Sequence, residues 1–107
     1  MKTLKFRPHL IPPILSREKT STWRLFDDKD LQVGDTIELI NSDTKEVFGE
    51  ADLTDVKEKP LGQLEDVDFE GHEKFESEEK MYETYRKYYG DKVDENIIVK
   101  IIKFKLI

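Results

Sequence analysis

The chain of 107 residues contains no cysteine. This absence excludes disulfide bonds, thiolate nucleophiles and cysteine-ligated zinc. The two histidines, His9 and His72, are far apart, and neither belongs to an H-x-x-H or H-E-x-x-H pattern. The five glycines occur singly, so the glycine-rich loops that bind nucleotide phosphates are absent as well. We therefore expect no metal and no cofactor.

Long apolar runs are also missing from the sequence. The uninterrupted ones are far shorter than the ~20 residues that cross a bilayer. No apolar stretch of signal-peptide length follows the basic start of the chain. A length of 107 residues suits one compact domain. We expect a single domain over residues 1–107, monomeric and cytoplasmic, with no membrane partner.

The charge is acidic overall but unevenly distributed. The sequence has 18 Lys and Arg against 24 Asp and Glu, a net charge of -6. Residues 1–24 contain six basic residues and one acidic residue, whereas residues 65–80 contain eight acidic and two basic ones. Affinity for long nucleic acid comes largely from phosphate neutralisation, so the net charge disfavours long duplex DNA. The basic first quarter is compatible with a small anionic ligand, or the opposite charges merely keep the surface soluble.

Alternation of apolar and polar residues predicts several short strands. The pattern favours strands over 3–7, 20–25 and 36–40, then a hairpin turn over 41–44 and an antiparallel return over 46–51 that extends through Leu53 and Val56. Gly49 lies inside this returning strand and indicates a bulge or a close backbone approach. The β-branched run over 96–107 predicts a last strand that is buried on one or both faces.

Two helices complete the predicted elements. A short helix over 12–18 begins with prolines, which the first helical turn tolerates. A longer helix begins after Ser77 as N-cap and ends at Gly90. The fold class is therefore α+β. We predict a small β-barrel of about five or six mostly antiparallel strands with two flanking helices, in which the final strand returns to the first.

Lys19, Thr22 and Arg24 are the candidate site residues. Thr22 and Arg24 share one face of the strand over 20–25, and Lys19 lies at its start. Together they would form a cationic site with a hydroxyl, suited to a phosphate, a carboxylate or a polar base edge. A lysine of lowered pKa could also deprotonate the threonine for acyl chemistry. The alternative is an ordinary solvated strand surface.

Aromatic residues have two interpretations as well. Tyr82, Tyr85, Tyr88 and Tyr89 recur at helical spacing, so they either stack on nucleic-acid bases or form the core and its rim. Trp23 lies beside the candidate site, but strict alternation places it on the opposite face of the strand, which favours a core position.

The ordered motifs resemble the ASCH domains of the PUA-like superfamily. The pattern Lys19-x-x-Thr22-x-Arg24 followed by Val33-Gly34-Asp35 is similar to the family's G-x-K-x-x-T-x-R and its later Gly-Asp turn. The segment Phe69-Glu70-Gly71 before a helix and the apolar residues 101–104 match as well, so the resemblance covers nearly the whole chain. One departure is Arg17, which stands where the motif usually has glycine. This exchange is expected to strain the helix end or to add a cation.

The resemblance implies a PUA-like barrel in which the Lys-Thr-Arg motif lines a cleft that binds RNA or a modified nucleoside. A bacterial branch of the family is similar to amidohydrolases that deacetylate N(4)-acetylcytidine with a lysine, a threonine and a glutamate. Carried over by motif, the catalytic residues would be Lys19, Thr22 and Glu70, with Glu73 as the alternative acid. Arg24, Thr20 and Trp23 would bind the ligand.

Three hypotheses remain open at this stage. The protein is a binding module for RNA or a modified nucleoside, an amidohydrolase that acts on an acylated cytidine, or an interaction protein whose acidic stretch meets a basic partner. The motif favours the first two, and the net charge favours a small ligand over long RNA.

Overall fold

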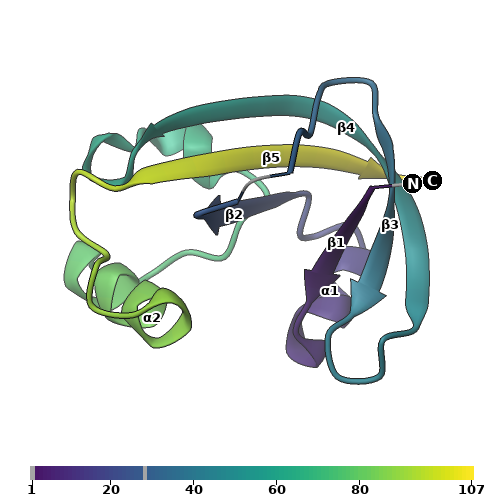
Figure 1. Ribbon diagram of the computed structural model, residues 1–107, viewed down its shortest axis with the longest axis horizontal. Helices are drawn as coiled ribbons and strands as arrows, with labels where there is room; N and C mark the ends of the chain where they lie inside the picture. Colours follow the sequence, from purple (N-terminus) through teal and green to yellow (C-terminus); the bar gives the residue numbers. More distant parts are fainter. Residues whose placement is uncertain (1, 28) are drawn as a thin grey trace.

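The computed structural model of the protein describes residues 2–27 and 29–107, which form a five-stranded mixed sheet and two α-helices (Figure 1). The strands are β1 (Thr3–Phe6), β2 (Ser21–Leu25), β3 (Thr36–Asn41), β4 (Val47–Pro60) and β5 (Ile98–Leu106). The helices are α1 (Ile11–Leu15) and α2 (Glu78–Tyr89), and three short 3₁₀ turns are η1 (Pro8–Leu10), η2 (Leu61–Gln63) and η3 (Asp66–Phe69). This confirms the predicted α+β class. None of the helices in these two ranges is both long and apolar enough to span a membrane.

The sheet curls into a half-barrel because its longest strand, β4, is bent and pairs with different strands along its length. In the order β1-β3-β4-β5-β2, β4 pairs with β3 through its first half and with β5 from Ala51 onward. Register shifts opposite Gly49 and between Leu53 and Asp55 bend the strand, as expected of bulges. Of the two alternatives predicted at Gly49, a bulge or a close backbone approach, the register shift beside this residue shows the bulge.

The predicted return of the last strand to the first is wrong. β5 lies between β4 and β2, whereas β1 pairs in parallel with β3. The reason is that β5 is apolar on both faces: Ile102 packs in a core with β1, β3 and α1, and Ile101 packs in a second core with β2 and α2. A strand that is apolar on both faces is fully buried only when it lies in the interior of the sheet with both faces covered. The edge strands β1 and β2 are instead linked by a side chain, since Arg24 Nη2 donates to the carbonyl oxygen of Lys5 at 2.7 Å.

The two helices differ in how they end. In α2, Ser77 Oγ accepts the backbone N–H of Lys80 at 3.2 Å and Gly90 follows the last turn at φ +94°, as predicted. Helix α1 is shorter than predicted. It ends at Leu15, and two residues later Arg17 adopts φ +69°, in the left-handed region that favours glycine.

Candidate functional site

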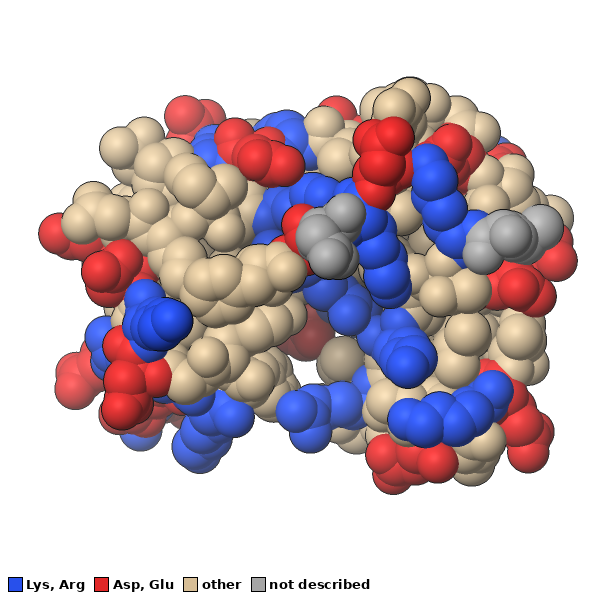
Figure 2. Space-filling model, viewed as in Figure 1, with Lys and Arg blue, Asp and Glu red and all other residues tan. Residues whose placement is uncertain are grey.

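A cleft of about 520 Å³ lies along the open side of the half-barrel, where β1 and β2 are not joined by backbone hydrogen bonds. One wall comes from β1 and η1, the floor from β2, and the other wall from α2 and the segment before it, residues 72–75. Figure 2 shows a hollow near the middle of this face with basic side chains along its edge. The motif residues Lys19, Thr22 and Arg24 all line this cleft, the arrangement that the resemblance to ASCH domains implied.

Lys19 is a buried lysine held by two acceptors. Its ammonium group donates to Glu73 Oε2 at 2.6 Å and to the carbonyl oxygen of Ser21 at 2.7 Å, and only 4% of the side chain is exposed. Burial lowers the pKa of Lys19, although the neighbouring Glu73 opposes this shift. Burial alone raises the pKa of Glu73, but His72 and Lys19 more than offset it and lower that pKa overall.

Gly71 is what brings Glu73 to Lys19. The backbone N–H groups of Thr20 and Ser21 both donate to the carbonyl oxygen of Gly71, at 2.8 and 3.1 Å. Gly71 has φ +73°, and a Cβ there would lie 2.0 Å from Thr20 Oγ1. Only glycine fits this close approach. The contact fixes the start of the segment at the beginning of β2 and directs the next residues toward the cleft.

The preceding turn η3 is fixed to the sheet by a buried carboxylate. Asp68 forms ion pairs with Lys57 at 2.8 Å and Lys59 at 2.7 Å, both from β4, and accepts the backbone N–H of Glu65. Burial alone raises the pKa of Asp68, but these three donors hold it at about 2. Asp68 therefore anchors η3, the element that leads into the site segment.

The structure brings Glu73 rather than Glu70 to the lysine. The side chain of Glu70 is 73% exposed, and its carboxylate lies 4.0 Å from Lys103 on the other side of Gly71. The alternative acid named from the sequence is thus the one that contacts Lys19. Thr20 is exposed and lies outside the cleft lining, so the structure does not bring it together with the other motif residues.

His72 is a site residue that the sequence reasoning missed. Its ring stacks on the Trp23 indole with centroids 3.9 Å apart, and only 4% of its side chain is exposed. Nδ1 lies 2.8 Å from the carbonyl oxygen of Glu73, which fixes the proton on that nitrogen, and Nε2 is 3.5 Å from the Tyr85 hydroxyl. Burial, aided by Lys19, lowers the pKa of His72 to about 4, so the ring is neutral at pH 7. Its position between Gly71 and Glu73 is the signal that could have identified it.

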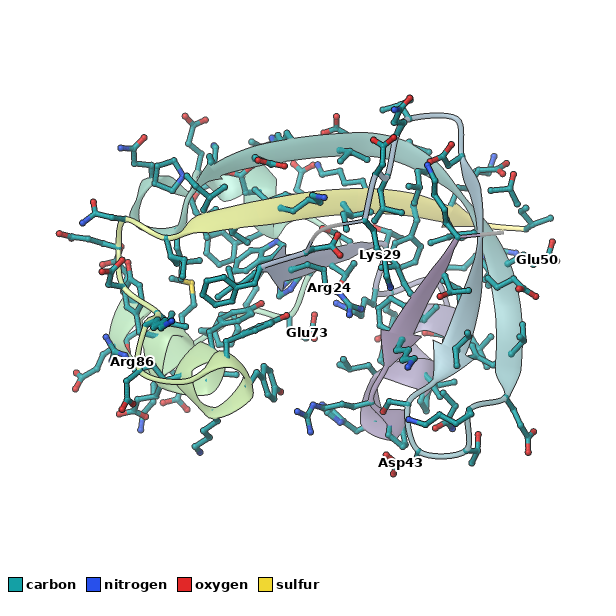
Figure 3. The ribbon with its side chains drawn as sticks, in the orientation of Figure 1. Arg24, Lys29, Asp43, Glu50, Glu73 and Arg86 are labelled. Carbon is teal, nitrogen blue, oxygen red and sulfur yellow. The ribbon has the colours of Figure 1, made fainter. Side chains whose placement is uncertain are left out.

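Arg24 spans the base of the cleft (Figure 3). Its Nε donates to Thr22 Oγ1 at 3.3 Å, and its guanidinium stacks over the Phe6 ring at 4.8 Å. Figure 3 shows Arg24 and Glu73 between the α2 side and the β1 side of the molecule. The only hydrogen bond described for the Thr22 hydroxyl is this one from Arg24, and Lys19 is engaged by Glu73 and Ser21.

Aromatic side chains form the second wall of the cleft. Trp23 is buried and donates its Nε1–H to the carbonyl oxygen of Asp68 at 3.3 Å, yet part of it lines the cleft beside His72. Along α2, Tyr85 is buried, Tyr89 is half-buried and Tyr88 is exposed at the mouth. The tyrosine stripe therefore forms both core and rim, and its rim residues offer ring faces to a ligand.

This arrangement suits a small aromatic ligand with polar edges. Within residues 2–27 and 29–107, no three His, Asp or Glu side chains converge into a metal site. The chemistry available is ionic and hydrogen-bonding contact from Lys19, Arg24 and Glu73, a hydroxyl on Thr22, and stacking on aromatic rings. The fold and the cleft together define a half-barrel domain with a cationic, aromatic-walled site along its open side.

This fold is that of the ASCH domains, as the sequence motifs indicated. The chain superimposes on the ASCH domain from Lactobacillus crispatus with a TM-score of 0.69 and 19% identity, over 89% of this chain and 68% of that one. The ASCH protein from Zymomonas mobilis gives a TM-score of 0.69 at 16% identity, over 96% of this chain and 65% of that one. The superposition on a hypothetical protein, PH0355, covers 100% of this chain and 100% of that one, with a TM-score of 0.76 and 21% identity. No protein-family model and no curated protein sequence matches the chain.

Proposed function

We propose that this ASCH-fold protein binds a nucleoside or a short RNA end in the cleft, with the base between the aromatic wall and the Lys19, Thr22 and Arg24 motif. The observation that carries the proposal is that all three motif residues line one cleft together with four aromatic residues: Trp23, Tyr85, Tyr88 and Tyr89. Unpaired bases are recognised by stacking on aromatic rings and by hydrogen bonds to their polar edges.

The charge distribution supports a small ligand rather than long RNA. The chain as a whole carries a net charge of -6, which opposes a polyanion that extends over the surface. The basic side chains at the cleft attract an anionic or polar ligand locally. A nucleoside or a short end reaches these groups while meeting, of the acidic side chains in the stretch over 65–80 that the structure describes, only Glu73, which is already paired with Lys19.

Binding of short RNA tests this proposal. A fluorescent pentaribonucleotide is titrated with the protein at low salt, and the titration is repeated at higher salt and with Arg24→Gln. We expect measurable affinity that weakens with salt, and a loss of about tenfold in the variant because a charge-assisted hydrogen-bond donor is removed. Lys105→Gln, which removes an exposed charge outside the cleft, is the matched control. Undetectable affinity of the wild-type protein at low salt would refute binding of RNA.

A second candidate function, deacetylation of N(4)-acetylcytidine, is favoured by the buried Lys19. Burial lowers the pKa of Lys19, which increases its neutral fraction and its ability to act as a base. In this reaction Thr22 Oγ attacks the acetyl carbonyl and Lys19 accepts the hydroxyl proton. Lys19 then returns the proton to N4 as the C–N bond breaks, which releases cytidine. Water, deprotonated by Lys19, hydrolyses the acetyl–threonine ester to acetate and restores both side chains.

The hydrogen bonds of Lys19 and Thr22 favour the binding function over this reaction. Lys19 donates to Glu73 and Ser21, and Thr22 accepts from Arg24, so substrate would have to bring Lys19 and Thr22 together. The test is cytidine release from N(4)-acetylcytidine at high enzyme concentration. Turnover that disappears in both Lys19→Ala and Thr22→Ala would establish the enzyme, whereas turnover that persists in both would assign it to a contaminant. Absence of turnover in the wild type would leave the binding function.

A further inference from the structure

The cleft contains more positive charge than its acidic residue neutralises. Four cationic side chains line it: Lys5, Arg7, Lys19 and Arg24. Among residues 2–27 and 29–107, a single carboxylate lines the cleft, that of Glu73, and this group is already paired with Lys19 at 2.6 Å. An excess of positive charge in one cleft of a chain with a net charge of -6 indicates an anionic ligand.

Among the described residues, Lys5 and Arg7 are the cleft cations whose charged groups have no ionic or hydrogen-bonding partner. Both are exposed at the end of β1, and neither side chain forms an ion pair or a hydrogen bond with another residue that the structure describes. Lys19 and Arg24, by contrast, are engaged in the base of the cleft. The free donors therefore lie at the mouth and the occupied ones at the bottom.

Arg7 reaches across this mouth. Its guanidinium carbon lies 4.4 Å from the centroid of the Tyr88 ring, so a side chain from the β1 wall contacts the α2 wall. An arginine stacked on a ring keeps the N–H groups at its edge free, and that edge matches the paired oxygens of a phosphate. Lys5 adds a second positive charge on the same wall.

We propose that the ligand carries a phosphate, held at the mouth by Arg7 and Lys5 while its base enters the aromatic part of the cleft. This inference rests on the proposed function and specifies the ligand class: a nucleoside monophosphate or the 5′-phosphorylated end of a short RNA, in preference to an uncharged nucleoside. The phosphate lies at the solvent-exposed rim, where it is easily accommodated. The uncharged base occupies the buried part, where no further anion is needed.

Calorimetric titration with CMP and with cytidine tests the inference. We expect the wild-type protein to bind CMP about tenfold or more tightly than cytidine, because each charge-assisted contact contributes substantially. The Arg7→Gln and Lys5→Gln variants should each reduce this affinity ratio, and Lys105→Gln should preserve it. Both targets are exposed, so the substitutions leave the core intact. The ratio should also fall as salt is added.

The possible outcomes separate the phosphate site from the proposed function. Equal affinities of the wild type for CMP and cytidine would overturn the phosphate site while retaining nucleoside binding. A ratio that survives in both Arg7→Gln and Lys5→Gln would also overturn it. Binding of neither compound, nor of a short RNA, would reject the proposed function itself. A 5′-phosphorylated trinucleotide compared with its unphosphorylated form distinguishes an RNA end from a free nucleotide as the source of the phosphate.

Discussion

The ammonium group of Lys19 lies 2.6 Å from the carboxylate of Glu73, although the two residues are 54 positions apart in the sequence. Lys19 is 4% exposed and Glu73 is 41% exposed, so the pair connects the buried base of the cleft with solvent. Glu73 is the partner that allows a cation to remain at the base of the cleft. Loss of this carboxylate should therefore affect both the stability of the fold and the protonation of the lysine.

Glu73→Gln should destabilise the protein by about 1–2 kcal/mol, a value reduced from that of a fully buried pair because Glu73 is partly exposed. Removing the carboxylate leaves Lys19 buried without a counter-charge, and urea unfolding measures the loss. The matched control is Glu70→Gln, since Glu70 is exposed and lies 4.0 Å from Lys103. It should change stability by less than about 0.5 kcal/mol. Equal effects of the two substitutions would contradict the role assigned to Glu73.

His72 should make the protein less stable at mildly acidic pH. Its pKa is about 4 in the folded protein against 6.5 for an ordinary histidine, because burial and then Lys19 oppose its protonation while Glu73 favours it. The unfolded chain therefore binds a proton that the folded chain excludes between these pH values. The sign follows directly: the free energy of unfolding falls as the pH drops from about 6.5 to about 4, by about 2–3 kcal/mol.

The His72→Phe variant isolates this contribution. Phenylalanine retains a flat ring against Trp23 but has no titrating group. Its stability should be almost independent of pH between about 6.5 and about 4.5, whereas that of the wild type declines. Urea unfolding at several pH values gives both slopes. If the slopes coincide, the acid sensitivity originates elsewhere. Asp68 does not interfere, since its stabilising contribution is lost only as the pH falls from its ordinary pKa of 3.8 toward its folded pKa of about 2, below this range.

Local sequence signals were sufficient for most of the elements. Alternation located the β2 strand, and Ser77 and Gly90 located both ends of α2, because these signals depend on residues a few positions apart. The neighbour of β5 was predicted wrongly, since alternation says nothing about which strands pair. Its two-sided burial in the interior of the sheet depends on packing from α1 and α2 together.

Of the candidate site, the convergence of the motif residues could be predicted from the sequence, whereas the acidic partner of Lys19 could not. Lys19, Thr22 and Arg24 lie within six residues of a single turn and strand, so their convergence follows from local geometry. The choice between Glu70 and Glu73 depends on an irregular segment without periodicity. There, the contact of the Gly71 carbonyl with β2 decides which carboxylate faces the lysine. No pattern in the segment itself encodes that long-range contact.

Arg17→Gly should stabilise the protein. Arg17 has φ +69°, which costs a residue with a Cβ about 1 kcal/mol, and glycine removes this strain. The substitution also deletes a surface hydrogen bond from Arg17 Nη1 to the carbonyl oxygen of Leu106 at 3.1 Å, so the net gain should be about 0.5 kcal/mol. Arg17→Ala loses the same bond but keeps the strain. Thermal unfolding should rank glycine above alanine, and the reverse order would show that the left-handed backbone is not strained.

Gly71→Ala should both destabilise the fold and weaken ligand binding. The added Cβ would lie 2.0 Å from Thr20 Oγ1, and the alanine would have to adopt φ +73°. The segment therefore has to leave its position on β2. We expect a loss of about 2–3 kcal/mol in urea unfolding, of which about 1 kcal/mol is backbone strain.

Gly34→Ala supplies the matched control: Gly34 has φ +94°, but a Cβ there meets nothing within 4 Å. It should therefore show the strain alone and retain CMP binding. Gly71→Ala should bind CMP more weakly even under conditions where it is fully folded, because the segment over 72–75, which forms part of the cleft wall, is displaced. If the two alanine variants were equally stable and bound CMP equally well, the contact between Gly71 and Thr20 would not be what positions the site.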